Sequence, residues 1–280
     1  MAEAVIVEAV RSPVGKRNGG LSGVHPGELS AQVLNGLAER AGIDPEIVDD
    51  VIWGCVMQAG EQALDIARTA VLAAGWPESV PGVTVDRQCG SSQQSVHFAA
   101  AGVVAGHYDV VVAGGVESMS RTPMGSSLSN GGHPYPEAFR GRYTQTPNQG
   151  IGAEMIAEQW GLSRTMLDEF SLGSHEKAAA AQDSGAFDDQ IVAIKDQDGN
   201  PVLKDEGIRR GTPIEKMAQL KPAFKEDGVI HAGNSSQISD GSAALLFMSA
   251  EKAKSLGLKP IARVHTATLA GADPVIMLTA

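Results

Sequence analysis

The sequence predicts an α/β fold: a mixed, mostly parallel five-stranded sheet flanked by helices, with a long inserted segment before the last strand. Short β-branched runs alternate with helical patterns up to residue 120, and a strand-like run returns at residue 243. These runs are apolar throughout, which is typical of strands buried on both faces. The chain has 280 residues, 42% hydrophobic and 20% charged, which suffices for a substantial core.

Apolar runs bounded by turn residues predict the strands. They cover residues 5–7, 51–57, 83–85, 110–113 and 243–249, with a further run at 261–266. Cys55 lies inside the second run, and we interpret it as a buried structural thiol because cysteines without a disulfide are among the most buried residues.

Helical spacing of apolar residues predicts the helices. They cover residues 28–41, 65–74, 90–105, 151–160 and 164–182. Gly42 and Gly75 are suitable ends for the first two helices. Asp65 is a suitable N-cap for the second helix and Ser163 for the last. Clusters of Pro, Gly, Ser and Asn over residues 121–150 predict loops.

This pattern predicts three parts. Residues 1–120 and 241–260 form the sheet domain, residues 121–240 form an inserted lobe, and residues 261–280 begin a further domain. The apolar residues near the end of the chain have no partner element, which indicates an incomplete architecture.

The composition disfavours several functions. With 22 basic and 33 acidic residues, the net charge of −11 disfavours binding to nucleic acid or to anionic membranes. No apolar run has the length of a membrane span, and the N-terminus lacks a signal-peptide pattern. Two cysteines provide no disulfide framework, so we expect a cytoplasmic protein. The histidines show no metal-ligand spacing, so we expect no metal site.

Cys89 is the strongest catalytic candidate. It follows the strand expected at 83–85 and precedes an Ala-rich helix, where the positive end of the helix dipole favours a thiolate. Gly90 would let a substrate carbonyl approach the backbone, and the Cys89 N–H could stabilise an oxyanion. From position alone, a nucleophile and a buried structural thiol are equal alternatives.

Four segments resemble thiolases (acetyl-CoA acyltransferases) in order and spacing. They are residues 8–15 (EAVRSPVG), 85–92 (VDRQCGSS), 113–120 (AGGVESMS) and 220–241, which begins with LKPAF and ends with AGNSSQISDG. The resemblance implies a thiolase-like layered fold in which Cys89 attacks the keto carbon of a 3-oxoacyl-CoA. Acetyl-CoA then leaves, and free coenzyme A takes the acyl group from the cysteine; the reverse reaction is a Claisen condensation. Coenzyme A is therefore implied as a substrate, with no bound cofactor.

The resemblance also implies a coenzyme A-binding surface in the inserted lobe. Arg209, Phe224, Ala232 and Ser236 match positions that contact the nucleotide or the pantetheine arm in related enzymes. The alternatives are a solvated charge for Arg209 and core packing for Phe224. Gln149 stands where related enzymes carry a methionine that lines the acyl pocket. The acyl preference therefore stays open, from short chains to a bulky group such as a steroid side chain.

Two catalytic groups of the family have no counterpart in these 280 residues. Thiolases use a histidine from a Gly-His-Pro segment and a second cysteine, both in the C-terminal half. The literal Gly-His-Pro at 132–134 lies among the expected loops, so we interpret His133 as a loop residue, and no cysteine follows Cys89. We therefore expect the chain to be a fragment, the N-terminal half with its inserted lobe, that is inactive alone.

The resemblance further predicts a homodimer, or a dimer of dimers, that forms through a sheet edge near residues 110–119. Two alternatives to a thiolase stay open. One is a ketoacyl synthase-type condensing enzyme, which shares the layered fold and the cysteine at a helix N-terminus. The other is a non-catalytic module that binds acyl-CoA.

Overall fold

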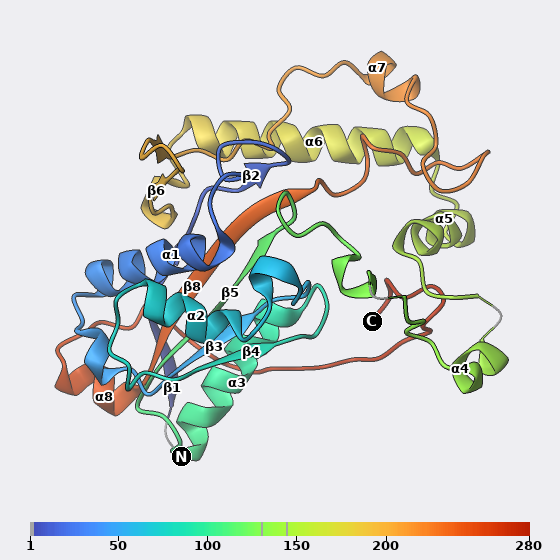
Figure 1. Ribbon diagram of the computed structural model, residues 1–280. Helices are drawn as coiled ribbons and strands as arrows, with labels where there is room; N and C mark the ends of the chain where they lie inside the picture. The colour runs from blue at the N-terminus through green and yellow to red at the C-terminus, as the bar shows by residue number, and fades with distance from the viewer. Residues whose placement is uncertain (1–2, 130, 144) are drawn as a thin grey trace. The chain divides into compact units, whose positions relative to one another are not determined.

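The computed structural model describes residues 3–129, 131–143 and 145–280, which form two compact units (Figure 1). Unit 1 comprises the described residues up to Ser127 together with Phe187–Gly207 and Ile238–Ala267. Unit 2 comprises the described residues of Leu128–Ala186 together with Ile208–Gln237 and Thr268–Ala280.

Unit 1 is built on one mixed sheet. Its strands, in spatial order, are β4 (Gly82–Val85), β3 (Asp50–Gly54), β5 (Val110–Ser118), β8 (Ser239–Ser249), β1 (Ala4–Arg11) and β9 (Ala262–Arg263); β2 (Gly15–Lys16) also pairs with β8. β3 is parallel to β4 and β5, whereas β8 is antiparallel to both β5 and β1. β1 therefore runs in the same direction as β3, β4 and β5. The expected mostly parallel five-stranded sheet is confirmed, and the two-residue strands β2 and β9 extend it within the described residues.

Several strand predictions need correction, and β1 and β8 are longer than the expected 5–7 and 243–249. The strand expected at 51–57 ends at Gly54, because the N–H groups of Val56 and Met57 donate to the Glu117 carboxylate at 2.9 and 3.3 Å. β5 is longer than expected, and the last expected strand is reduced to the two residues of β9. β5 also lies inside the sheet between β3 and β8, so the expectation of a sheet edge near this strand is wrong; β4 is an edge strand.

Helices cover both faces of the sheet (Figure 1). They are α1 (Pro26–Ala41) and α2 (Ile66–Ala73) on one face and α3 (Ser91–Ala105) on the other. Neighbouring strand residues alternate between two apolar clusters: Leu246 and Met248 pack in the cluster of α1 and α2, and Phe247 packs in the cluster of α3. The uninterrupted apolar runs in the sequence therefore reflect strands buried on both faces.

The helix ends follow the sequence signals with one exception. α1 ends at Gly42, which has a φ of 66°, and Ser163 caps the helix that follows it by accepting the N–H of Met166 at 3.3 Å. Asp65 precedes α2 with a φ of 56° and caps no helical N–H; its carboxylate accepts the Thr84 hydroxyl on β4 at 2.6 Å. Asp65 therefore connects α2 to the sheet.

The remaining elements are short, apart from α5 and α6. They are α4 (Glu137–Arg142), α5 (Gln149–Gln159), α6 (Arg164–Asp183), α7 (Ile214–Ala218), α8 (Ala250–Ser255), β6 (Ile194–Lys195), β7 (Pro201–Val202) and four 3₁₀ turns at Pro45–Ile47, Gly60–Gln62, Ser126–Leu128 and Asp188–Gln190. α5 and α6 match the two helices expected in the inserted lobe. In the described part of the chain, no helix is both long enough and apolar enough to cross a membrane.

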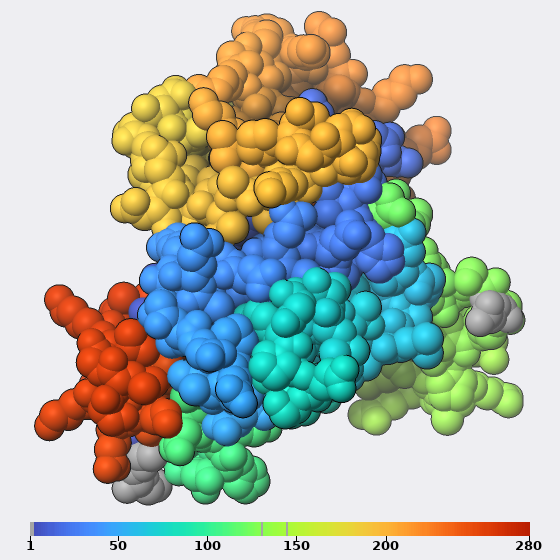
Figure 2. Space-filling model, turned by 60° about the vertical axis from the view of Figure 1, so that its left-hand side comes forward, coloured from blue at the N-terminus to red at the C-terminus, as the bar shows by residue number. Residues whose placement is uncertain are grey.

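The bounds of the two units differ from the domain bounds expected from the sequence. Phe187–Gly207 belongs to unit 1 and Thr268–Ala280 to unit 2. Asp205 accepts two hydrogen bonds from the Arg11 guanidinium on β1, at 2.7 and 3.0 Å, and this guanidinium also lies over the Phe187 ring. Figure 2 shows the segment Phe187–Gly207, in yellow-orange, against blue residues near the N-terminus. The ion pair between Arg11 and Asp205 therefore joins part of the segment expected in the inserted lobe to the sheet of unit 1.

Candidate functional site

Cys89 lies in the tight turn between β4 and α3. The Asp86 carboxylate accepts the N–H of Gln88 at 2.6 Å, and the N–H of Gly90 donates to the carbonyl of Arg87 at 3.1 Å. Gln88 has a φ of 48°, a left-handed conformation that costs a non-glycine residue energy and persists only where the surroundings enforce it. This turn leaves Cys89 exposed immediately before the N-terminus of α3.

Ser91 fixes the turn from the helix side. Its hydroxyl accepts the N–H of Arg87 at 2.9 Å and donates to the carbonyl of Gln88 at 2.6 Å. The N–H of Gln94 donates to the carbonyl of Gly90 at 2.8 Å, which begins the helical hydrogen bonds. The positive end of the α3 dipole therefore faces the cysteine, as the nucleophile interpretation requires.

Two glycines let the first turn of α3 approach the sheet. A Cβ atom at Gly54, at the end of β3, would lie 2.3 Å from the backbone N of Ser92. A Cβ atom at Gly115, on β5, would lie 2.1 Å from the Ser92 hydroxyl oxygen. Only glycine fits at these positions, so close contacts with the backbone of β3 and β5 fix the position of the helix that follows Cys89.

Cys55 has the opposite environment. It is buried directly after β3, where its N–H donates to the carbonyl of Val85 at 3.1 Å. Burial, with the negative charges of Glu117 and Asp86, raises the pKa of the Cys55 thiol to about 12. The thiol is protonated at neutral pH, which agrees with a structural role.

In unit 2, the start of α5 lies against Phe224. Gln149 is exposed at the first position of α5. The next residue, Gly150, contacts the Phe224 ring so closely that a Cβ atom would lie 2.1 Å from the ring. Phe224 is nevertheless 44% exposed, so it forms an open apolar wall and not a core residue.

Ala232 and Ser236 are both exposed on a short segment that two helices of unit 2 hold in place. The Glu154 carboxylate on α5 accepts the N–H groups of Val229 and Ile230 at 2.9 and 2.8 Å. α6 holds the same segment through Asp168, described below. The sequence carries no local signal that Glu154 or Asp168 holds this segment, because their partners in it lie more than sixty positions away.

Arg209 and His133 are also exposed in unit 2. The Arg209 N–H donates to the His175 ring at 3.2 Å, which orders the backbone beneath an exposed guanidinium. The ring of His133 accepts the N–H of Tyr135 at 3.1 Å, in the loop before α4. In the described residues, no three side chains of the metal-ligating types form a group that could hold a metal ion.

Comparison with known proteins places these features in a family. Residues 4–251 match the thiolase N-terminal domain. The chain is 48% identical to a steroid 3-ketoacyl-CoA thiolase of Mycobacterium tuberculosis, over 100% of this chain and 70% of that protein. It is 43% identical to a 3-ketoacyl-CoA thiolase of Saccharophagus degradans, over 98% of this chain and 71% of that protein.

A solved structure gives the same result. The fold matches the crystal structure of the Bacillus anthracis acetyl-CoA acetyltransferase with a TM-score of 0.88 and 42% identity, over 99% of this chain and 73% of that one. The fold and these matches define an α/β acyltransferase. The chain belongs to the thiolase family, which favours the thiolase interpretation over a ketoacyl synthase.

Proposed function

We propose that the protein cleaves a 3-oxoacyl-CoA with coenzyme A, or runs the reverse Claisen condensation, through an acyl group on Cys89. The observation that carries this proposal is the exposed thiol in the left-handed turn at the N-terminus of α3. A thiolate at this place is a suitable nucleophile for an acyl carbon.

In the cleavage direction, the Cys89 sulfur attacks the keto carbon and the bond to the neighbouring carbon breaks. The electron pair of that bond leaves with the acetyl-CoA enolate, which takes up a proton. The thiol of coenzyme A then displaces the cysteine sulfur from the acyl group and loses its proton in turn. The reaction needs no electron carrier and no cofactor besides the substrate coenzyme A.

We propose that the exposed residues of unit 2 bind coenzyme A. The Arg209 guanidinium suits a phosphate, and the Phe224 ring offers an apolar wall. Ser236 can hydrogen-bond a pantetheine amide beside Ala232, since both residues are exposed on one segment.

The acyl group has two candidates. A linear 3-oxoacyl chain is the first, which places the enzyme in fatty-acid breakdown. A bulky group such as a steroid side chain is the second, because exposed Gln149 stands in place of the family's methionine and one relative at 48% identity is named for steroids. A Gln149→Met variant should raise kcat/KM for the short substrate acetoacetyl-CoA relative to kcat/KM for a 3-oxoacyl-CoA with a longer or bulkier acyl group.

The test combines thiol labelling with a cleavage assay. Iodoacetamide should label Cys89 in the 280-residue chain and leave Cys55 unlabelled until the protein unfolds, as mass spectrometry of tryptic peptides will show. Acid and base assistance contributes about 10²–10⁴-fold per group. We therefore expect turnover only from a longer form of the protein that supplies the histidine and second cysteine of the family.

Matched variants complete the test. In that longer form, Cys89→Ser should abolish coenzyme A-dependent cleavage, and Cys55→Ala should retain it. Full activity of the Cys89→Ser protein would overturn the proposed nucleophile.

We further propose a cytoplasmic homodimer, or a dimer of dimers, that forms across β4. β4 is an edge strand of the sheet, and such a strand can pair through its outer backbone groups with a second copy. Val83 on β4 is 42% exposed. Sedimentation should give a dimer for the wild type and a monomer for Val83→Lys. A monomeric wild type at micromolar concentration would contradict this assembly.

A further inference from the structure

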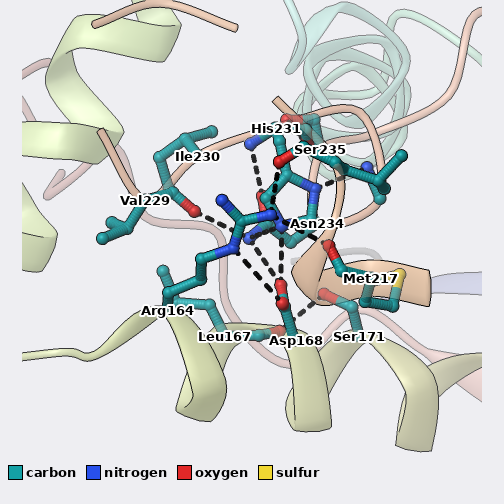
Figure 3. Close-up of polar contacts among 12 residues, drawn as sticks. Arg164, Leu167, Asp168, Ser171, Met217, Val229, Ile230, His231, Asn234 and Ser235 are labelled. Atoms are coloured by element: carbon teal, nitrogen blue, oxygen red, sulfur yellow. Dashed lines mark hydrogen bonds and ion pairs between the residues drawn. The ribbon is translucent and has the colours of Figure 1, made fainter. Parts of the chain in front are cut away.

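Unit 2 contains a polar cluster of buried Asp168 and His231 with partly buried Asn234 and Arg164, which Figure 3 shows between α6 and the loop above it. The side chains of His231 and Asp168 are 0% and 2% exposed. Buried ionisable groups persist where hydrogen bonds compensate for lost hydration, so the contacts of this cluster show what it holds.

The contacts of His231 fix its proton. The N–H of Gly233 donates to Nδ1 at 3.1 Å, so Nδ1 carries no proton. Nε2 therefore carries the proton and donates to the Asp168 carboxylate at 2.7 Å. Both ring nitrogens are occupied and the ring is buried, so His231 touches no substrate, and its effect is on the backbone around it.

Asn234 extends the hold on the same backbone. Its Nδ2 donates to the Asp168 carboxylate and to the carbonyl of Val229, both at 3.0 Å. Its Oδ1 accepts the N–H of His231 at 2.8 Å. The hydroxyl of Ser235 donates to the carbonyl of His231 at 2.9 Å. Residues 229–235 are therefore tied, through side chains and backbone, to one carboxylate of α6.

Arg164 ties a second stretch to that carboxylate. Its Nη2 donates to the carbonyls of Met217 and Leu220 at 2.9 and 2.5 Å, at the end of α7. Its Nε lies 3.6 Å from the Asp168 carboxylate as an ion pair. Asp168 thus anchors both the stretch that leads to Phe224 and the segment that contains Ala232.

The exposed residues of the segment alternate with the anchored ones. Ala232 is exposed between buried His231 and the bonded N–H of Gly233, and Ser236 is exposed directly after Ser235. We propose that Asp168, His231 and Asn234 are positioning residues for the pantetheine arm of coenzyme A, because they hold residues 232–236 in one conformation before the ligand binds. A segment ordered in advance loses less entropy on binding. This inference rests on the proposed binding of coenzyme A by unit 2.

The test separates the two ends of the ligand. Isothermal titration calorimetry will measure the Kd of coenzyme A and that of adenosine 3′,5′-bisphosphate, which lacks the pantetheine arm. Asp168→Asn and His231→Gln should each raise the Kd of coenzyme A about 10-fold and change the Kd of the adenosine bisphosphate less than about twofold. Glu169→Gln, at the exposed neighbouring position of α6, is the matched control and should change neither.

A general loss of structure in the cluster variants would weaken the binding of both ligands. If the variants weaken the binding of both ligands, or of neither, at a temperature well below unfolding, the positioning role is overturned. Arg209→Ala should show the opposite pattern, with weaker binding of the adenosine bisphosphate. If the wild type binds coenzyme A and Ser236→Ala weakens it while the cluster variants do not, the inference fails and the proposed function stands. If the wild type does not bind coenzyme A, both fail.

Hydrogen exchange of the wild type tests the same point without a variant. The N–H groups of residues 229–231, 233 and 234 donate hydrogen bonds, so these amides should exchange slowly before coenzyme A is added. Exchange at the rate of an open loop would overturn the inference, because the segment would then not be ordered in advance.

Discussion

Unit 1 and unit 2 bury different kinds of side chain. The buried clusters of unit 1 are apolar, with Trp53, Leu246 and Phe247 among their members. Among the described residues of unit 2, three buried side chains are ionisable and three are apolar: Glu154, Asp168 and His231, and Ala157, Met217 and Ile230. An apolar core tolerates exchanges that conserve volume, whereas a buried ionisable group depends on single partner atoms.

The helices explain this contrast. α1 buries ten of its 16 residues against its sheet, whereas the 20-residue α6 buries only Asp168. A helix with one buried residue gains little from the hydrophobic effect. Directed hydrogen bonds from that residue therefore hold the neighbouring loops of unit 2, and polar groups specify its geometry.

The largest expected effect is from Asp168→Ala. Removing this carboxylate leaves the Arg164 charge and the His231 ring without a buried partner. The loss should cost about 3–5 kcal/mol in free energy of unfolding, measured by urea denaturation, with faster amide exchange confined to unit 2. Glu169→Ala, at an exposed position on the same helix, is the control. A cost no greater than that of the control would remove the contrast between the units.

Leu246→Ala tests the apolar side of the comparison. Leu246 is 0% exposed on the central strand β8. A cavity there should lower the free energy of unfolding by about 2–5 kcal/mol, equally at pH 5 and pH 8. Leu246→Met should cost less than about 1.5 kcal/mol because it conserves volume. Equal losses for the two variants would show that this core is not closely packed.

Unit 1 also contains acidic residues away from water, the buried Asp240 and the partly buried Asp205. The pH dependence of the Asp205 contribution has a definite sign. Burial acts to raise the pKa of Asp205, but the hydrogen bonds from Arg11 and Val14 and the Arg11 charge lower it below its ordinary value. The contribution is therefore complete above the unfolded pKa of about 3.9 and is lost as pH falls through the lower folded value.

Asp205→Asn should reduce the free energy of unfolding at pH 7 by about 1.5–3 kcal/mol, the range for hydrogen bonds to charged groups. The difference from the wild type should shrink below pH 3, as urea titrations across pH will show. A difference that grows in acid would reverse the sign argued here.

The smallest effect is expected at Arg210. Its guanidinium pairs with Asp183 at 2.7 and 2.8 Å, but both side chains are exposed. Exposed ion pairs contribute little because water screens them, so Arg210→Ala should leave the urea midpoint of unit 2 unchanged within error. A clear shift would show that surface charge as well as buried charge specifies this unit.

Local signals in the sequence predicted the features that depend on local contacts. The apolar run through Leu246 predicted β8, Gly42 predicted the end of α1, and the Ala-rich run after Cys89 predicted a helix that begins just after this residue. Position alone left a nucleophile and a buried thiol as equal alternatives, and the structure shows Cys89 exposed. Contacts between distant residues were not predictable. Arg11 and Asp205 are 194 positions apart, so the sequence could not show that part of the inserted segment returns to the sheet.

The same limit applies to turns whose partners lie elsewhere. Asp65 has the residue type of an N-cap, yet the Thr84 hydroxyl on β4 competes for its carboxylate. The predicted ligand residues of unit 2 are exposed, but the hydrogen bonds of Asp168 to His231 and Asn234 join distant residues, so the sequence could not show them.

The close packing of Gly54 and Gly115 against Ser92 limits which positions directed evolution can vary. The helix that follows Cys89, the proposed nucleophile, packs against the main chain at these two glycines, and any larger residue there would collide with Ser92. A mutagenesis library aimed at new acyl groups should keep both glycine codons constant and vary positions near Gln149, where we propose the acyl group binds. Variants with new substrate preferences would then keep both glycines, because these two residues fix the position of the helix after Cys89.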